Sequence, residues 1–190
     1  MSGASVRLVR ALAALAVAAA LTLSACAGHA TKPLSDLAAM PSGGAVFHPE
    51  PQLFTAGQPA TNDWRAFADA GVHTVINLRT PGEMQGRDER AEVEAAGLRY
   101  LALPVDGAAS VNPQNAQRLT TLLAEASGPV LLHCHSGNRA GGLLALARAQ
   151  AGMPAADALE LGRRAGMKST EAPVRAALGL PALPSPSPSH

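Results

Sequence analysis

The chain has 190 residues, a formal net charge of +1 and 15% charged residues. Aromatic residues make up 3% of it, and it contains no run of lysines and arginines. Nucleic-acid binding needs a positive surface or stacking rings, so we expect no nucleic-acid partner. The length suits one domain once the two ends of the chain are set aside.

The N-terminus has the layout of a secretory signal. Arg7 and Arg10 precede an apolar run at 11–23, which is shorter than the about 20 residues that span a bilayer. The run ends in LSAC, which resembles the lipobox of bacterial lipoproteins. The resemblance implies cleavage before Cys26, lipid on its sulfur, and stable anchoring on the periplasmic side of a membrane. Ala27 suggests the outer membrane, and an ordinary signal peptide is the alternative.

Composition divides the chain into four expected parts. Residues 1–25 are the signal peptide, and 26–44 are a tether of small and polar residues broken by proline and glycine. Residues 45–180 form the domain, and 181–190 are a Pro/Ser-rich tail that we expect to be extended or disordered. Loss of the two arginines of the signal changes the formal charge from +1 to −1.

Strand-like and helix-like segments alternate through the domain. Apolar runs rich in β-branched residues predict strands, and capping residues before periodic apolar residues predict helices. The expected strands are short runs within 46–57, then 72–78, 98–105 and 129–134. The expected helices are 61–71, 88–97, 112–128, 139–152, 154–166 and 171–179. This alternation predicts an α/β fold with a central, mostly parallel sheet flanked by helices.

The strand at 129–134 is expected to deliver Cys134 to the carboxyl edge of the sheet, where α/β proteins place ligands. A short loop follows, and a helix begins near Arg139; residues 134–139 are called the Cys134 loop below. The first amides of a helix lack intrahelical acceptors and carry partial positive charge, so they hold oxyanions. Arg139 adds a planar fork for two oxygens. The expected phosphate-binding groups are the amides of His135, Ser136, Gly137, Asn138 and Arg139.

Cys134 is expected to be a reactive thiol. If Cys26 carries lipid, Cys134 is the only other cysteine of the chain. Exported proteins usually pair their cysteines, so an unpaired thiol is either buried or functional. A helix N-terminus and a nearby cation both favour the thiolate form of cysteine. The same loop therefore supplies a nucleophile and a seat for a tetrahedral anion.

The sequence HCHSGNRAG resembles the signature of cysteine-dependent phosphatases, in which histidine and cysteine open a loop that arginine closes. Two features depart from that signature. Four residues rather than the usual five separate Cys134 from Arg139, which is also the length seen in rhodanese-type sulfurtransferases. Ala140 replaces the usual serine or threonine, which predicts slow breakdown of a phosphocysteine unless Ser136 substitutes. The loop therefore leaves phosphorus and sulfur chemistry open.

The rest of the chain extends the resemblance. LFTAGQPATNDWRAFADAGVHTVINLRTPGE, AAGLRYLALPVD and VLLHCHSGNRAGG resemble the phosphatase-like domain family first described on beta-lactamase-hydrolase-like proteins. The resemblance covers about residues 46–166, and the family itself has the shorter loop. It implies a fold like that of dual-specificity phosphatases, with Cys134 as nucleophile, Arg139 binding phosphate and His133 orienting the loop. Some members of the family are labelled sulfurtransferases.

A phosphatase also needs a general acid, which protonates the leaving oxygen and later activates water. Asp106 follows a strand and lies upstream of Cys134, where dual-specificity phosphatases keep their acid. Asp-Gly is also a turn signal, and Glu83, Asp88 and Glu89 are rival candidates. A sulfurtransferase that takes sulfur from thiosulfate needs no such acid.

Other polar residues have structural expectations. His133 and His135 flank Cys134, but no second free cysteine completes a set of zinc ligands, so we expect no metal. The sequence GQP at 57–59 is expected either near the pocket or in a turn. Arg79 is expected to form a structural ion pair, and an approach to an anionic substrate is the alternative.

Together these features predict an exported, lipid-anchored phosphatase. It would hydrolyse phosphate monoesters through a phosphocysteine at Cys134, with Asp106 as acid and without metal or organic cofactor. One alternative is a rhodanese-like sulfurtransferase that uses a Cys134 persulfide. Another is a non-catalytic module that binds oxyanions. The sequence does not name the phosphorylated substrate.

Overall fold

A computed structural model describes residues 37–183 of the chain. Its strands are β1 (Val46–Glu50), β2 (Leu53–Ala56), β3 (Thr74–Asn77), β4 (Arg99–Ala102) and β5 (Val130–His133). Its α-helices are α1 (Trp64–Asp69), α2 (Glu89–Ala95), α3 (Pro113–Glu125), α4 (Asn138–Gln150), α5 (Ala155–Arg164) and α6 (Glu171–Ala177). Short 3₁₀ helices of the described region are η1 (Thr61–Asp63) and η2 (Pro81–Met84).

The strands form one sheet in the order β1-β2-β5-β3-β4. Strands β2, β5, β3 and β4 run parallel, and β1 pairs with β2 in the antiparallel direction. All four residues of β5 are buried, as is typical of a parallel strand covered on both faces. The register pairs His133 with Ala56 of β2 and with Asn77 of β3. The carboxyl ends of the three central strands therefore meet beside Cys134.

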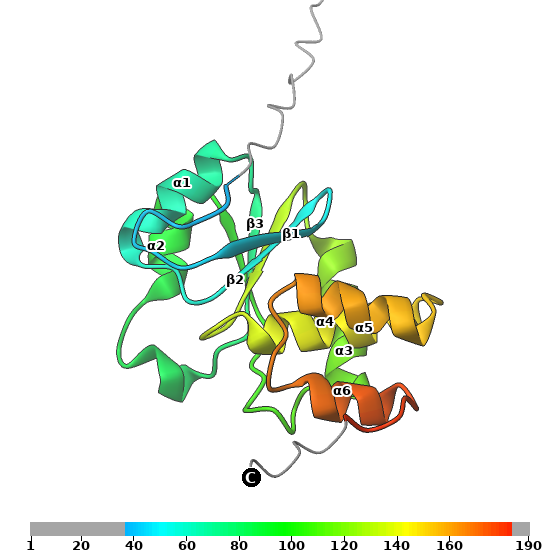
Figure 1. Ribbon diagram of the computed structural model, residues 1–190. Coiled ribbons are helices and arrows are strands. Elements are labelled where there is room, and N and C mark those ends of the chain that lie inside the picture. Colours follow the sequence, from blue (N-terminus) through cyan, green and yellow to red (C-terminus); the bar gives the residue numbers. More distant parts are fainter. Residues whose placement is uncertain (1–36, 184–190) are drawn as a thin grey trace, which may run out of the picture. The chain divides into compact units, whose positions relative to one another are not determined.

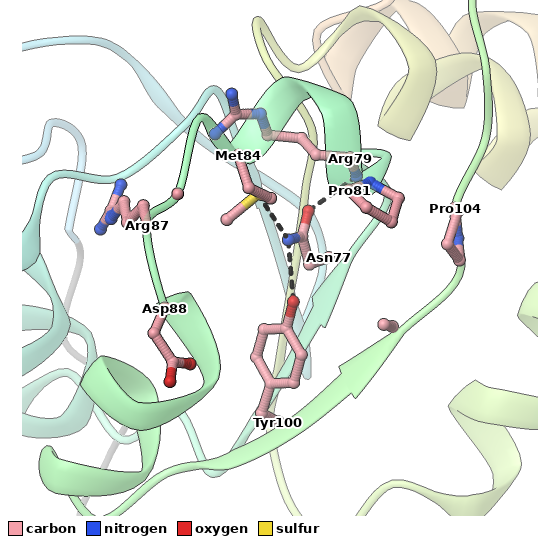
Figure 2. Close-up of a pocket in the computed structure, with 10 residues that line it drawn as sticks. Asn77, Arg79, Pro81, Met84, Arg87, Asp88, Tyr100 and Pro104 are labelled. Carbon is pink, nitrogen blue, oxygen red and sulfur yellow. Dashed lines mark hydrogen bonds between the residues drawn. The ribbon is translucent and has the colours of Figure 1, made fainter.

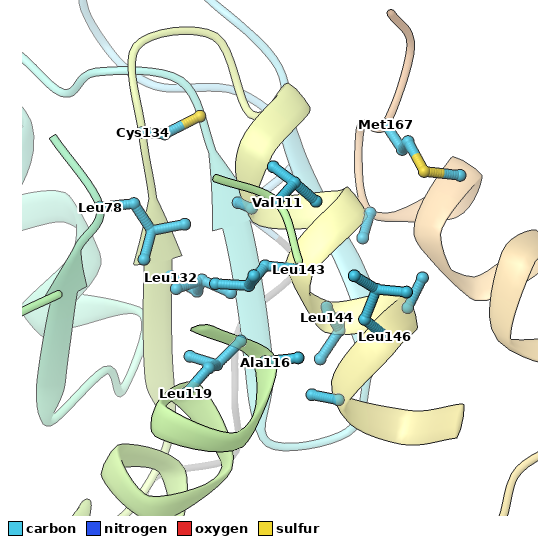
Figure 3. Close-up of a cluster of buried hydrophobic side chains, with 14 of the residues drawn as sticks. Leu78, Val111, Ala116, Leu119, Leu132, Cys134, Leu143, Leu144, Leu146 and Met167 are labelled. Carbon is cyan, nitrogen blue, oxygen red and sulfur yellow. The ribbon is translucent and has the colours of Figure 1, made fainter. Parts of the chain in front are cut away.

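Helices cover both faces of the sheet. Helices α1 and α2 lie on one side of it, and α3, α4, α5 and α6 lie on the other (Figure 1). Alternate residues of each strand face opposite sides. Leu131 packs in the cluster with α1 and α2, whereas Leu132 and Cys134 pack in the cluster with α3 and α4. Figure 3 shows Cys134 at the end of β5, where the strand leaves this second cluster.

Helix α4 contacts its neighbours closely because glycines occupy its fourth and fifth positions. A Cβ atom on Gly141 would lie 2.5 Å from the Met167 amide nitrogen and 2.6 Å from the Gly162 carbonyl oxygen. A Cβ atom on Gly142 would lie 2.7 Å from Oγ1 of Thr170. The start of α4, and with it the Cys134 loop, is therefore fixed against α5 and the segment that follows it.

The predicted strands and helices are all present, with somewhat shorter bounds, and the mostly parallel sheet is confirmed. Asn112 caps α3 as its position suggests, because its Oδ1 accepts a hydrogen bond from the Asn115 amide at 3.0 Å. Helix η2 was not predicted. It forms because Thr80 and Glu83 make a capping box, in which the Thr80 amide donates to Glu83 Oε2 at 2.9 Å.

The expected tether, 26–44, is described from residue 37 onward, and this part contacts the domain. Met40 is buried among the residues that pack on α1, and the Ser42 amide donates to Oδ1 of Asp63 at 2.9 Å. Part of the expected tether is therefore packed against the domain. The expected signal peptide, Cys26 and the tail from residue 184 lie outside the described residues. Within 37–183, no helix has both the length and the apolar character needed to cross a membrane.

Candidate active site

Cys134 opens the loop that joins β5 to α4. The residue is 0% exposed, and its amide lies 3.5 Å from the carbonyl oxygen of Ala56 at the end of β2. Gly57 pairs with Ser136 in an isolated antiparallel bridge. A Cβ atom on Gly57 would lie only 3.2 Å from the carbonyl oxygen of His135. The glycine therefore allows the segment after β2 to lie directly against the Cys134 loop.

Helix α4 begins inside the Cys134 loop. Gly137 has a φ of 82°, in the left-handed region that favours glycine. Its carbonyl accepts the first hydrogen bond of the helix, from the Gly141 amide at 2.9 Å. The amides of Asn138, Arg139 and Ala140 therefore have no intrahelical acceptor, and the positive end of the helix dipole lies at the loop. This geometry suits an oxyanion.

The side chain of Asn138 clamps the loop to the segment after α5. Its Oδ1 accepts hydrogen bonds from the amides of Lys168 at 2.7 Å and Thr170 at 3.1 Å. Its Nδ2 donates to Oγ of Ser169 at 2.8 Å. The side chain is therefore structural, and only the backbone amide of Asn138 is suited to hold an anion.

Arg139 is 8% exposed and is held by three hydrogen bonds. Nη1 donates to Glu83 Oε2 at 2.8 Å and to the Val105 carbonyl oxygen at 2.6 Å, and Nη2 donates to Glu83 Oε1 at 2.5 Å. The bond to Glu83 raises the pKa of Arg139 despite burial, and Cys134 raises that pKa further.

The two bonds to Glu83 use one edge of the Arg139 guanidinium, and the Val105 carbonyl takes the other Nη1 hydrogen. Its Nε hydrogen and one Nη2 hydrogen are left over, and they lie side by side on the adjacent edge of the planar group. A pair of parallel N–H donors matches two oxygens of a phosphoryl group. Arg139 can thus bind Glu83 and a tetrahedral anion at the same time.

Glu83 does not fit the role of general acid. Both of its carboxylate oxygens accept hydrogen bonds from Arg139, and the Thr80 amide donates to one of them. The hydrogen bond with Arg139 lowers the pKa of Glu83 from 4.5 to about 2. Partial burial opposes this shift, and hydrogen bonds with Thr80 add to it. Glu83 is therefore ionised at neutral pH and has no proton to give.

Asp88 also has a structural partner, whereas Asp106 does not. Asp88 caps α2 by accepting a hydrogen bond from the Ala91 amide at 3.1 Å. Asp106 is exposed in the loop after β4, and no hydrogen bond or ion pair joins it to another described residue. It directly follows Val105, whose carbonyl binds Arg139. Among the candidate acids, Asp106 therefore combines a free carboxyl group with a short link to the Cys134 loop.

His133 contacts the buried carboxylate of Glu89. Its Nε2 lies 3.0 Å from Glu89 Oε1, at ion-pair distance but outside hydrogen-bond alignment. His133 is 0% exposed and Glu89 is 1% exposed, and the ring of Trp64 packs against the imidazole. Burial would raise the pKa of Glu89, but the contacts with His133 and Gln58 hold it below its usual value. Glu89 therefore stays ionised and orients His133 instead of serving as an acid.

Gln58 and Arg79 lie beside these groups. The Gln58 amide donates to the His135 carbonyl at 3.1 Å, and its Nε2 donates to Glu89 Oε2 at 2.5 Å. Its Oε1 accepts a hydrogen bond from Arg79 Nη1 at 2.5 Å. Arg79 Nε lies 3.9 Å from Glu83 Oε1, which confirms the expected ion pair. The contacts of Gln58, Glu83 and Glu89 were not predicted, because they join segments that are distant in the sequence.

A hollow of about 420 Å³ opens beside this network (Figure 2). Within it, Asn77 Nδ2 donates to the Tyr100 hydroxyl at 2.9 Å and lies 3.7 Å from Met84 Sδ. Helix η2, which carries Glu83, forms one wall. The lining residues are Asn77, Arg79, Pro81, Met84, Gly86, Arg87, Asp88, Tyr100, Ala102 and Pro104. The hollow therefore adjoins the segment that holds Arg139 and the segment that leads to Asp106.

Ala140 follows Arg139 and is 0% exposed, in the same apolar cluster as Cys134. Residue 140 carries no hydroxyl, and the hydroxyl of Ser136 lies in the exposed part of the loop.

Within the described part of the chain, no group of three or more His, Cys, Asp or Glu side chains is arranged to hold a metal ion.

Residues 49–153 match the family described as "Beta-lactamase hydrolase-like protein, phosphatase-like domain". The chain is 38% identical over 113 residues to a beta-lactamase hydrolase-like protein of Xylella fastidiosa, a match that covers 57% of this chain and 26% of the relative. It is 34% identical over 102 residues to a protein of the same name from Agrobacterium fabrum, covering 52% and 23%. The chain spans about a quarter of the length of these curated relatives.

Solved structures show the same fold. TpbA of P. aeruginosa is 28% identical, with a TM-score of 0.56 over 70% of this chain and 84% of that one. A candidate phosphatase of Neisseria meningitidis Z2491 is 23% identical, with a TM-score of 0.60 over 69% and 96%. The fold is thus that of the cysteine phosphatases. With its Cys134 loop in the matched region, the chain belongs to the phosphatase-like domain family of beta-lactamase hydrolase-like proteins.

Proposed function

We propose that the protein is a cysteine-dependent phosphatase that hydrolyses phosphate monoesters through a phosphocysteine at Cys134. One observation carries the proposal. Arg139, in the loop that Cys134 opens, is held by Glu83 on one edge and keeps a second donor edge at the start of α4. A thiol, a guanidinium edge and free amides in one loop can bind a phosphoryl group and attack it.

The reaction has two steps. In the first, the Cys134 thiolate forms a bond to phosphorus while the bond from phosphorus to the leaving oxygen breaks. Asp106 gives its proton to that oxygen, so an alcohol departs instead of an alkoxide. In the second, water attacks phosphorus, Asp106 takes its proton, and the bond from sulfur to phosphorus breaks. Inorganic phosphate leaves, and the thiolate and the protonated Asp106 are restored.

The amides of residues 135–139 and the free edge of Arg139 serve both steps. They face the oxygens on which negative charge gathers as phosphorus changes its partners. His133 is held in one orientation by Glu89 and adjoins Cys134.

Steady-state assays separate this function from its alternatives. The purified protein is given an aryl phosphate, and separately thiosulfate with cyanide, with Cys134→Ser as the control. Phosphate release that depends on Cys134 supports the phosphatase. Thiocyanate formation without phosphate release supports a sulfurtransferase, which the four-residue spacing also suits. A wild-type protein that shows neither activity but binds phosphate supports an oxyanion-binding module.

We also propose that the protein is exported and carries lipid on Cys26, on the periplasmic side of a bacterial membrane. The LSAC sequence after a basic start and a short apolar run supports this. Labelled palmitate fed to cells that express the protein should enter the wild-type chain but not Cys26→Ser. An unlabelled wild-type chain would contradict the anchor.

A further inference from the structure

Carboxylates from other elements hold both ends of the Cys134 loop. His133, immediately before Cys134, faces Glu89 of α2 at 3.0 Å. Arg139, at the far end, donates two hydrogen bonds to Glu83 of η2. The position of each end therefore depends on an element outside the loop.

Two further residues join these carboxylates to each other. Gln58 donates to Glu89 Oε2 at 2.5 Å and accepts from Arg79 at 2.5 Å, and Arg79 Nη2 donates to the Glu83 carbonyl. A continuous series of contacts therefore connects His133, at one end of the loop, to Arg139, at the other end. We call this set the bracing ring, which consists of His133, Glu89, Gln58, Arg79, Glu83 and Arg139.

Burial makes the ring sensitive to substitution. Glu89 is 1% exposed, and a buried carboxylate is stable only when cations and hydrogen-bond donors compensate its charge. Removing one member of such a set leaves the others buried without partners, so the surrounding groups rearrange. A change at Glu89 or Gln58 is therefore transmitted to His133 and Arg139.

The ends of the loop set the geometry of the reaction. The sulfur of Cys134, the loop amides and the guanidinium of Arg139 must all contact the same phosphoryl group. A displacement of about 1 Å can reduce the rate of a reaction by about a hundredfold. Contacts that join both ends of the loop, with His133, Glu89 and Arg139 buried, limit such displacement. Surface contacts would do so less, because water competes with them.

We infer that Glu89, acting through His133, is a positioning residue for Cys134, and that Gln58 couples it to Arg139. Neither residue needs to touch the substrate. The inference rests on the proposed function, because it assigns the ring to a loop that attacks phosphorus.

Glu89→Gln and Gln58→Ala test the inference, with Glu94→Gln as the control. Glu94 lies on the same helix and pairs with Arg90 at the surface, outside the ring. For each variant, kcat and KM with an aryl phosphate are measured, together with the rate at which iodoacetamide alkylates Cys134. Circular dichroism confirms that the variants are folded. The alkylation rate reports on the loop even if the protein does not hydrolyse phosphate esters.

Both ring variants should lower kcat by about tenfold or more while KM changes by less than about threefold, because positioning acts mainly in the transition state. Both should also slow alkylation, and Glu94→Gln should leave all three values within about twofold of wild type. The kcat and the alkylation rate of the double variant should be no lower than those of the less active single variant. The effects of coupled residues are not additive. Alkylation unchanged in folded Glu89→Gln, or fully additive losses, would overturn the inference. If the wild type releases no phosphate but the ring variants slow alkylation, the proposed function fails and the ring stands.

Discussion

Arg139 divides its hydrogen bonds between the protein and a prospective anion. Glu83 and the Val105 carbonyl take three of its donors, and two on the adjacent edge remain. Lysine has the same charge but no second edge, so it cannot bind a carboxylate and a phosphoryl group in this way.

Arg139→Lys should therefore lower kcat by about 10²–10³-fold, the range seen when an anion-stabilising donor is removed. The measurement is steady-state phosphate release from an aryl phosphate. Arg148→Lys is the control, because Arg148 lies on the same helix and pairs with Glu50 away from the loop. An Arg139→Lys enzyme as active as the control would contradict the role assigned to Arg139.

Asp106→Asn should slow hydrolysis of alkyl phosphates by about 10²–10⁴-fold, because an alkoxide needs a proton to leave. The loss should be smaller for a nitrophenyl phosphate, whose leaving group is stable as an anion. Rates with the two substrates are compared for Asp106→Asn and Asp88→Asn. If Asp88→Asn shows the leaving-group dependence and Asp106→Asn does not, the acid has been assigned to the wrong residue.

Ala140→Ser should speed breakdown of the phosphocysteine, because a hydroxyl beside the sulfur can donate a hydrogen bond to the departing thiolate. Ala140 is buried in the same cluster as Cys134. Rapid-mixing experiments should show a smaller burst and a faster steady state. Ala147→Ser, further along α4, adds a hydroxyl away from the loop. Equal turnover in wild type and Ala140→Ser would show that hydrolysis of the intermediate does not depend on this position.

At the scale of secondary structure, the site depends on how closely α4 approaches its neighbours. Gly141 has no room for a Cβ atom, whereas the nearest atom to a Cβ on Gly82 of η2 would be 4.0 Å away. Helix packing of this kind fixes the first turn of α4, which carries the amides of the loop.

Gly141→Ala should lower the free energy of unfolding by about 1–3 kcal/mol, the usual cost of overpacking. The surrounding atoms are backbone atoms of Gly162 and Met167, which cannot move as a flexible side chain would. Urea denaturation of Gly141→Ala and Gly82→Ala measures the difference. Equal loss in both would show that the tight contact does not limit packing.

At the scale of the whole molecule, Glu83 links the Cys134 loop to the stability of the protein in acid. Its pKa is lowered from 4.5 to about 2 in the folded protein, so folding favours the ionised form. This contribution to stability is complete above the unfolded pKa and is lost as pH falls toward 2.

The free energy of unfolding should therefore be less dependent on pH in Glu83→Gln than in wild type over this acid range. The difference between the two proteins should be largest above pH 4.5 and should shrink toward pH 2. Urea denaturation at several pH values measures it, with Glu125→Gln, an exposed residue of α3, as control. A constant difference between wild type and Glu83→Gln would contradict the assigned coupling.

The sequence allowed prediction of the elements but not of the contacts among their ends. Apolar periodicity marks β5 and α4, so the position of the Cys134 loop between them could be predicted. The partners of Arg139 and His133 lie on η2 and α2, and only the folded sheet brings those segments together. A capping box makes η2 visible in the sequence, but nothing in the pattern shows that Glu83 faces Arg139.

The central claim is that Cys134 attacks phosphorus, and the intact mass of an acid-quenched reaction tests it most directly. The protein is mixed with an aryl phosphate in one tube and thiosulfate in another, beside Cys134→Ser in both. We expect a mass increase of one phosphoryl group on the wild type alone, in the aryl phosphate tube. A persulfide from thiosulfate with no phosphoryl adduct would contradict the claim and make the protein a sulfurtransferase.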